Sequence, residues 1–165
     1  MHIDARTLDN GSLIEADLCI IGAGAAGISM ALEWISSGRK VILLEAGGFN
    51  PEERMQNLYR GESLDRPYYP LHAARLHFFG GTTGHWAGYC SPFDAIDFEK
   101  RDWVPHSGWP ITRADMDPFY ARANKVLELG PYEYDAAYWE GLDPEVRRLP
   151  LDDKVFYPKM WMFSP

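Results

Sequence analysis

The chain has 165 residues, of which 46% are hydrophobic and 14% aromatic, so it can bury a core of about one domain. Its formal net charge is −8, and its longest runs of Lys and Arg are two residues, which argues against nucleic acid and anionic membranes as partners. The sequence shows neither an uninterrupted apolar stretch of membrane-spanning length nor a basic N-terminal leader.

The cysteine content also narrows the possibilities. Cys19 and Cys90 lie far apart and match neither a disulfide framework nor the spacing of a metal site. We therefore predict no metal ligands. Because this cysteine usage suits a reducing compartment, we expect a cytoplasmic location.

The first predicted elements are a strand, a glycine-rich turn, a helix and a second strand. Leu18 to Ile21 is a short apolar run, and the glycines that follow it have the spacing G-x-G-x-x-G. Residues 25–37 are apolar nearly all round, which predicts a buried helix that Gly38 ends. Val41 to Leu44 is a second apolar run. Because both strands are continuously apolar, we expect a parallel sheet covered on both faces.

Each glycine of the turn has a physical role. Gly22 allows the tight turn out of the strand, Gly24 lets the backbone approach a pyrophosphate, and Gly27 lets the helix pack close to the sheet. The amides of Ala25 and Ala26 then open the helix, where free N–H groups and the helix dipole favour a phosphate. The turn therefore predicts a dinucleotide-binding site.

An acidic residue closes the second strand. Glu45 lies 18 residues after Gly27, at the position where dinucleotide-binding proteins keep a carboxylate. Such a carboxylate can accept hydrogen bonds from both hydroxyls of the adenosine ribose. It also repels a 2′-phosphate, so a cofactor of the NADP type is disfavoured.

The composition changes near residue 50. All 12 prolines follow this point, and the remainder is mostly irregular. A helix is predicted with Asp117 as its N-cap and Pro118 as its first residue, and Gly130 with Pro131 stops it. One βαβ unit supplies two parallel strands, whereas a doubly wound sheet needs several more. Because no second strand-helix-strand cycle is visible, we expect the chain to be the first part of a longer protein.

A second glycine cluster occupies residues 79–88. Its consecutive glycine N–H groups could face an anion, its hydroxyls could donate hydrogen bonds, and its aromatic rings could lie beside another ring. The residues concerned are Gly80, Gly81, Thr82, Thr83, His85 and Trp86. The alternative is a tight surface turn followed by a buried aromatic residue, and the spacing alone favours neither interpretation.

In combination, these motifs resemble the glucose-methanol-choline (GMC) oxidoreductases, which are FAD enzymes that oxidise alcohols and sugars. The resemblance covers residues 15–131, most of the chain. Besides the first turn, the matching segments are Leu44-Glu45-Ala46-Gly47-Gly48, Gly80-Gly81-Thr82-Thr83 and Gly108-Trp109-Pro110-Ile111 leading into Phe119-Tyr120. Within the family, the loop from Gly80 to Trp86 is most similar to the pyranose oxidases and the bacterial FAD-dependent sugar dehydrogenases.

The resemblance implies an α/β fold. Residues 1–100 would be the N-terminal part of a Rossmann-like FAD-binding domain with an incomplete parallel sheet and a flavin-contacting loop at 79–90. Residues 101–165, mostly irregular and helical, would begin a substrate or cap region. The residues implied in FAD binding are Gly22, Gly24, Ala25, Ala26, Gly27, Glu45, Ala46, Gly47, Gly80, Gly81, Thr82, Thr83 and His85. No catalytic residue is assigned, because the family's catalytic histidine lies near the C-terminus of the full protein.

The loop departs from the pyranose oxidases just before its histidine. Their loop is Ser-Thr-His-Trp, with the histidine bonded covalently to the flavin, whereas here Gly84 precedes His85. Three interpretations of His85 stay open: covalent attachment, a non-covalent contact near the flavin ring, and an ordinary loop histidine.

The function implied is that of an FAD-dependent oxidase or dehydrogenase acting on CH–OH groups of sugars or other small alcohols, by hydride transfer to the flavin. The isolated segment is expected to be inactive. Oxygen, a quinone and a cytochrome are all open as electron acceptors.

Two alternative functions are compatible with the same glycine-rich turn. One is an NAD-dependent dehydrogenase, against which the loop and the early switch to irregular chain argue. The other is a non-catalytic dinucleotide-binding module.

Overall fold

The computed structural model of the protein describes residues 1–152 and 154–165. The chain forms two compact units, Met1–Trp86 and Ala87–Pro165. The boundary after Trp86 is defined by how the backbone packs. The boundary predicted at residue 100 concerns something else, the division between a cofactor region and a substrate region, and it stays a prediction. Among the described residues, no helix is both long and apolar enough to cross a membrane.

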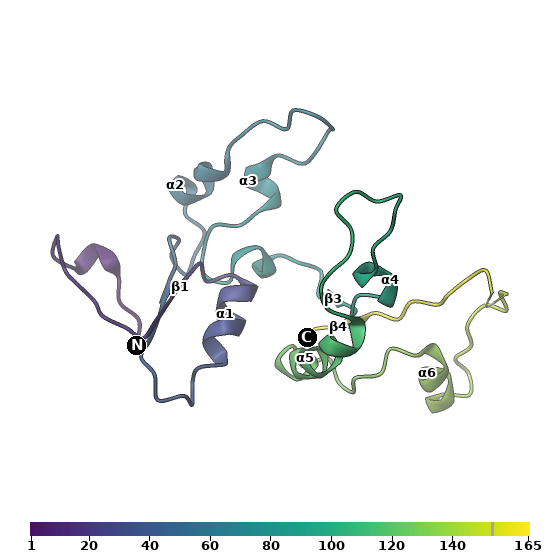
Figure 1. Cartoon of the computed structure of the whole chain (residues 1–165). Helices are drawn as coiled ribbons and strands as arrows, with labels where there is room; N and C mark the ends of the chain where they lie inside the picture. Colours follow the sequence, from purple (N-terminus) through teal and green to yellow (C-terminus); the bar gives the residue numbers. More distant parts are fainter. Residues whose placement is uncertain (153) are drawn as a thin grey trace. The chain divides into compact units, whose positions relative to one another are not determined.

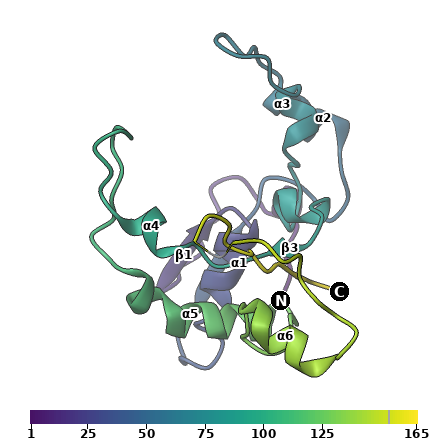
Figure 2. The same cartoon turned by 90° about the vertical axis from the view of Figure 1, so that its right-hand side faces the viewer.

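Unit 1 contains a parallel sheet and several short helices (Figure 1). Its elements are η1 (Ala5–Thr7), β1 (Leu18–Ile21), α1 (Ala25–Leu32), β2 (Val41–Leu44), α2 (Glu53–Gln56), η2 (Asn57–Tyr59), α3 (Leu71–Ala74) and η3 (Gly81–Gly84). Beyond η2 the chain makes a long loop at residues 60–70 before it returns to α3, which lies beside η2 (Figure 2).

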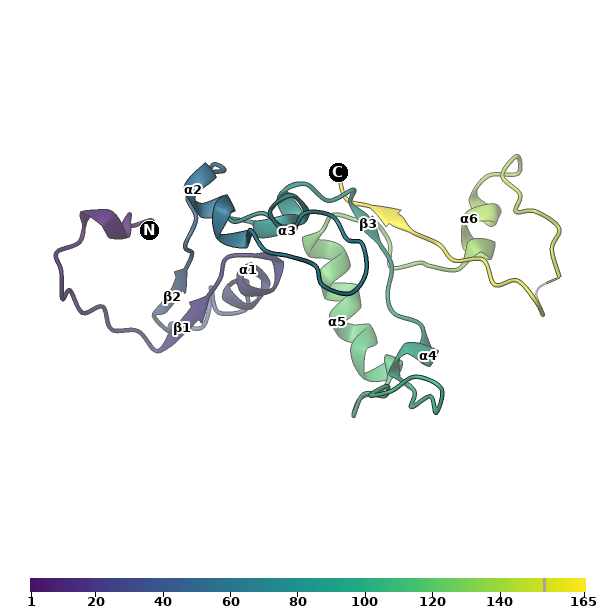
Figure 3. The same ribbon diagram turned by 90° about the horizontal axis from the view of Figure 1, so that it is seen from above.

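The predicted βαβ unit is confirmed. Strands β1 and β2 are parallel, with Leu18 opposite Val41 and Ile21 opposite Leu44, and α1 connects them (Figure 3). The amide of Gly22 extends the ladder by donating to the carbonyl of Leu44 at 2.7 Å. The chain is therefore of the α/β class.

Helix α1 is shorter than predicted. It ends at Leu32 instead of continuing to residue 37. The amides of Trp34 and Ile35 each bond three residues back, to Ala31 and Leu32, so the chain continues as tight turns to Gly38, whose φ is +71°. Apolar composition predicted the helix, but composition does not fix where the i to i−4 bonding gives way to turns.

The sheet is covered on one face within the described chain. Ile20 is only 6% exposed, and a Cβ atom added to Gly27 of α1 would lie 3.4 Å from its Cγ2 atom. On the other face, Ile21 is 84% exposed and its partner Leu44 is also exposed. The expectation of a sheet covered on both faces is therefore not met by these residues.

The described residues of unit 2 form one long helix, two short ones and a small antiparallel sheet. Its elements are β3 (Tyr89–Cys90), α4 (Ala95–Phe98), α5 (Arg113–Val126), α6 (Ala136–Leu142) and β4 (Met162–Phe163). In the sheet, Tyr89 pairs with Phe163 and their rings lie 4.5 Å apart between centroids.

Helix α5 begins earlier than predicted, so the assignment of Asp117 as its N-cap is wrong. The cap is Thr112, whose hydroxyl accepts from the amide of Asp115, while the Asp115 carboxylate accepts from the amide of Thr112 at 2.8 Å. This reciprocal capping box satisfies two amides at the helix start. Pro118 lies inside the helix, in its second turn, where it cannot donate the usual backbone hydrogen bond to the carbonyl four residues before it.

A polar side chain organises the chain after α5. Asn124 is 3% exposed, and its amide donates to the carbonyls of Gly130 and Pro131. Its oxygen accepts from the Tyr134 hydroxyl at 2.8 Å. Because buried polar groups must be paired, this residue holds the turn that follows the helix in one conformation.

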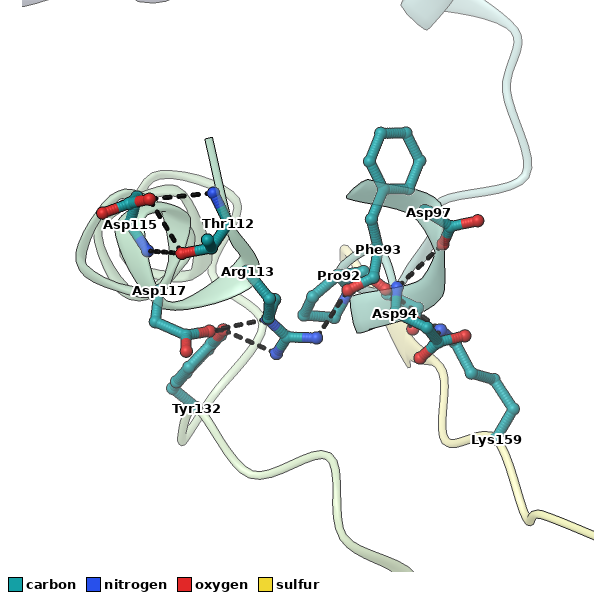
Figure 4. Close-up of polar contacts among 11 residues, drawn as sticks. Pro92, Phe93, Asp94, Asp97, Thr112, Arg113, Asp115, Asp117, Tyr132 and Lys159 are labelled. Carbon is teal, nitrogen blue, oxygen red and sulfur yellow. Dashed lines mark hydrogen bonds and ion pairs between the residues drawn. The ribbon is translucent and has the colours of Figure 1, made fainter. Parts of the chain in front are cut away.

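Asp117 takes part in an ion pair instead of a cap (Figure 4). Its Oδ1 atom accepts from Arg113 Nε at 2.7 Å and from the Tyr132 hydroxyl at 2.9 Å. The hydrogen bond from Arg113 holds the pKa of the Asp117 carboxyl below its ordinary value of 3.8. A second ion pair joins Lys159 to Asp94 at 2.8 Å.

Replacing Gly27 by alanine should destabilise unit 1 by about 1–3 kcal/mol, because the added Cβ would overlap the carbonyl oxygen of Gly22. Gly24→Ala is the matched control. Its Cβ would have no atom within 4 Å, so its stability should change by less than about 1 kcal/mol. Thermal unfolding of the two variants tests this, and equal melting temperatures would contradict it.

Asp117→Asn keeps an acceptor for Arg113 but removes the charge. Because the folded pKa of Asp117 is lowered, its ionised form stabilises the protein above pH 3.8, and this contribution is lost as the pH falls through the folded pKa. The wild type should exceed the variant by at most about 1 kcal/mol near neutral pH, since the pair is half-exposed. The difference should shrink in acid, and a melting series against pH in which it grows would refute this assignment.

Candidate functional site

The turn between β1 and α1 has the geometry that its glycines predict. Gly22 has a φ of +96°, a conformation that other residues rarely adopt. Gly27 is buried, and a Cβ atom there would overlap the carbonyl oxygen of Gly22. Glycine at these two positions is therefore required by the turn and by the close packing of α1.

The start of α1 is open. Gly24 is the N-cap residue, with extended backbone angles, and a Cβ atom there would meet nothing within 4 Å. Ala25 and Ala26, the first two residues of the helix, are both exposed. The first N–H groups of a helix have no carbonyl within the helix to bond to, so this end can receive an anion.

The carboxylate of Glu45 ties the turn to the end of β2. Its Oε2 atom accepts from the amide of Ala23 at 2.8 Å, and its Oε1 atom accepts from the amide of Gly47 at 2.9 Å. Each oxygen keeps a second lone pair, so the carboxylate can still accept a hydroxyl donor. Glu45 is half-buried beside the glycine turn, as its spacing predicted.

The second glycine cluster lies directly against the first. Gly80 forms a parallel bridge with Gly24, and its amide donates to the carbonyl of Ala23 at 2.8 Å. A Cβ atom added to Gly81 would be 3.2 Å from the Cα of Gly24. The sequence contained both motifs, but only the fold shows that they meet.

A third glycine turn joins them. The amide of Phe79 donates to the carbonyl of Gly48 at 2.9 Å, and a Cβ atom on Gly47 would overlap the carbonyl oxygen of His77. Gly47 is therefore a packing position. Ala46, which precedes it, is exposed. The predicted site residues from Gly22 to Gly81 thus gather where three glycine turns touch.

The amides of Gly80 and Gly81 have internal partners. Gly80 donates to Ala23, and Gly81 donates to the carbonyl of Phe78 at 2.8 Å. Of the interpretations that the sequence left open, the one in which these N–H groups face an anion does not hold in this structure. The two glycines have φ of +93° and +60°, and these angles and the close approach to Gly24 explain why glycine is present.

The hydroxyls of the loop bond locally. The hydroxyl of Thr83 donates to the carbonyl of Gly80 at 2.5 Å, and the Thr82 oxygen accepts from the amide of Leu76 at 3.3 Å. The Thr82 hydroxyl therefore keeps its own proton to donate to a ligand. Both threonines are exposed.

His85 lies at the exposed end of the loop. It follows η3, and its amide donates to the carbonyl of Thr82 at 3.2 Å. The ring of Phe78 packs against Gly84, and a Cβ atom added to Gly84 would lie 2.6 Å from that ring. A serine or threonine at this position would therefore require the Phe78 ring to move. Trp86 is 42% exposed, which does not match a surface turn followed by a buried aromatic residue.

Two further residues belong to this assembly although the sequence pattern did not single them out. Ala23 is fully buried and bonds to both Glu45 and Gly80 through its backbone. Gln56 bonds to the segment that leads into the loop. Ala23 lies inside the fingerprint, whereas Gln56 carries no local signal, because its partners are 16 to 21 residues away.

Together these features define an α/β chain whose βαβ unit has an open helix start and a carboxylate at the end of the second strand, as in nucleotide-binding units of this kind. No protein-family model matches the chain, and no solved structure matches it.

Curated oxidoreductases do match it. The chain is 22% identical to a 2-methyl-1,2-propanediol dehydrogenase of Mycolicibacterium austroafricanum, over 75% of this chain and 26% of that protein. It is 30% identical to a 6'''-hydroxyparomomycin C oxidase of Streptomyces lividus, over 68% of this chain and 22% of that protein. An uncharacterized GMC-type oxidoreductase of Mycobacterium tuberculosis is 31% identical over 74% of this chain and 21% of its own length.

These similarities support the GMC-type oxidoreductases as the family of the chain. The chain spans about a quarter of the length of the curated relatives that it matches. Similarity to the pyranose oxidase branch is not among these findings.

Glu45→Gln should loosen the junction of the turns. A glutamine side chain has one acceptor oxygen, so the amide of Ala23 or of Gly47 loses its partner, at a cost of about 1–3 kcal/mol. Hydrogen exchange at these two amides and the melting temperature measure the effect. Glu62→Gln is the control, because Glu62 is exposed in the 60–70 loop and the charge change is the same. Equal behaviour of the two variants would show that Glu45 has no such role.

Proposed function

We propose that the chain is the FAD-binding, N-terminal part of a GMC-type oxidoreductase that oxidises CH–OH groups of alcohols or sugars. The observation that carries the proposal is the meeting of three glycine turns at the open start of α1, beside Glu45. The curated relatives support the reaction class, since their names are those of a propanediol dehydrogenase, a hydroxyparomomycin oxidase and GMC-type oxidoreductases.

The residues present fit a dinucleotide. The exposed first amides of α1 at Ala25 and Ala26 suit a pyrophosphate, and the empty space beside Gly24 leaves room for it. Glu45 has acceptor capacity left for ribose hydroxyls, and its charge disfavours a 2′-phosphate. The same fit would serve NAD, but the relatives and the glycine loop at residues 80–84 support FAD.

When bound, FAD supplies the acceptor for the hydride of the substrate carbon. The residues of this chain bind and orient the cofactor. Glu45 and the start of α1 hold the adenosine and pyrophosphate end, while Thr82 and His85 offer an exposed hydroxyl and imidazole at the end of the loop. We assign the base that takes the hydroxyl proton to no residue of this chain.

The proposed substrate is a small alcohol or sugar. One relative is a dehydrogenase by name and another is an oxidase. Enzymes of these two kinds differ in the electron acceptor, so the half-reaction that we propose for this chain is oxidation of the CH–OH group. The likeness of the loop to pyranose oxidases and bacterial sugar dehydrogenases is the reason to include sugars.

Absorbance of the purified full-length protein tests the proposal. Absorbance bands at about 370 and 450 nm, which are typical of any flavin, should be present in the wild type. Gly24→Val should abolish them while the protein stays folded, because the side chain enters open space in the structure and occupies the place of the pyrophosphate. Gly24→Ala should retain part of the flavin. A colourless wild type, or full flavin occupancy in folded Gly24→Val, would reject the proposal.

Acid precipitation of the yellow protein then separates the two flavin interpretations of His85. Flavin that stays with the pellet indicates a covalent bond, and free FAD indicates a contact only. We expect free FAD, since Gly84 aims the histidine less rigidly than the bulkier residue of the pyranose oxidases. Acid-stable flavin would overturn this expectation.

A further inference from the structure

We infer that Gln56 is a positioning residue that fixes where the loop at residues 80–84 crosses the glycine turn at Gly24. The inference rests on the proposed function for its effect on FAD. The role of Gln56 in the register of the loop does not depend on FAD.

Gln56 uses its side-chain amide fully on one segment. It is the last residue of α2 and is half-buried. Its Nε2 atom donates to the carbonyls of His72, within α3, and of Arg75, the residue that follows α3. Its Oε1 atom accepts from the amide of His77 at 3.1 Å. Both N–H groups of the amide are therefore occupied, and they clamp α3 and the residues after it to α2.

The clamped segment leads directly into the glycine junction. The carbonyl of His77 lies against Gly47, the amide of Phe79 bonds to Gly48, and the amide of Gly80 bonds to Ala23. Two ring contacts support this path, since the His77 ring lies 4.9 Å from that of Tyr59, and Phe79 lies 5.3 Å from Phe49. The position of His77 thus sets the position of the next four residues.

The register matters because only glycine fits at the crossing. Gly80 has a φ of +93°, and Gly81 approaches the Cα of Gly24 too closely for a side chain to fit unchanged. A slip by one residue would bring Phe79 or Thr82 to this place. The three hydrogen bonds of Gln56 oppose such a slip. Without them, a residue with a side chain could enter the glycine junction, where it does not fit.

An amide is the functional group that this clamp needs. Two of the three partners are carbonyl oxygens, which a carboxylate would repel. A protonated glutamic acid could donate to one of them while its other oxygen accepts from His77. Because the two carbonyls can bond only to its neutral form, the pKa of a glutamic acid at this position would be raised. Gln56→Glu is therefore a variant whose defect acid should relieve.

The experiment compares Gln56→Glu and Gln56→Leu in the full-length protein, with FAD affinity and the flavin absorbance spectrum recorded from about pH 8 down to about pH 5. We expect both variants to bind FAD at least about tenfold more weakly at the upper pH, as losing such hydrogen bonds implies. Gln56→Glu should approach the wild type as the pH falls, whereas Gln56→Leu should not. Asn57→Asp is the charge control, since aspartate can still accept from Arg60, and it should behave as the wild type.

Hydrogen exchange without FAD separates this inference from the proposed function. The amides of Phe79 and Gly80 should exchange faster in both variants and recover in acid only in Gln56→Glu, relative to the wild type at the same pH. Unchanged exchange, or unchanged FAD affinity and spectrum in Gln56→Leu, would overturn the inference. Equal pH profiles of the two variants would also overturn it. A wild type that binds no FAD would reject the proposed function, and the exchange data would then decide the register alone.

Discussion

The organisation of unit 1 depends on the backbone of Ala23, a fully buried residue between the first two glycines of the turn. Its N–H group donates to Glu45 at the end of β2, and its carbonyl accepts from Gly80 of the second glycine cluster. Buried backbone groups are costly to leave unpaired, so the turn, the end of β2 and the loop support one another. Glu45 extends the same bonding to Gly47. The junction at Ala23 is therefore held by main-chain groups and the carboxylate of Glu45.

The glycines of this junction serve two different physical needs. At Gly27, Gly47 and Gly81 a side chain would meet backbone atoms of a neighbouring segment, so glycine is needed for the chain to pack on itself. At Gly24 the backbone conformation suits any residue and the space is open. A glycine without a structural need inside such a turn is best explained by a ligand that approaches the backbone there. This contrast between Gly24 and the packing positions supports our proposal that the pyrophosphate lies at Gly24.

Unit 2 is organised by hydrogen-bonded polar side chains. One of them, Asn124, is buried, and others, such as Thr112, lie at the surface. Asn124 fixes the turn after α5 through three hydrogen bonds, and the capping box of Thr112 and Asp115 fixes the start of the same helix. Arg113 adds a link from α5 to the carbonyl of Phe93 and to Tyr132. Such directional contacts specify one arrangement of an otherwise irregular, proline-rich segment.

The sequence by itself determined the βαβ unit, the role of Gly22 and Gly27, and the position of Glu45, because these depend on local spacing and on the periodicity of apolar residues. It misplaced the end of α1 and the start of α5, where competing turns and the Thr112 capping box decide the boundary. It left open whether the amides of Gly80 and Gly81 face an anion, and the fold pairs them with Ala23 and Phe78. Only the tertiary structure decided that the glycine turns meet and that Gln56 holds the loop. Those contacts join residues far apart in the chain, and such pairings leave no period or spacing in a single sequence.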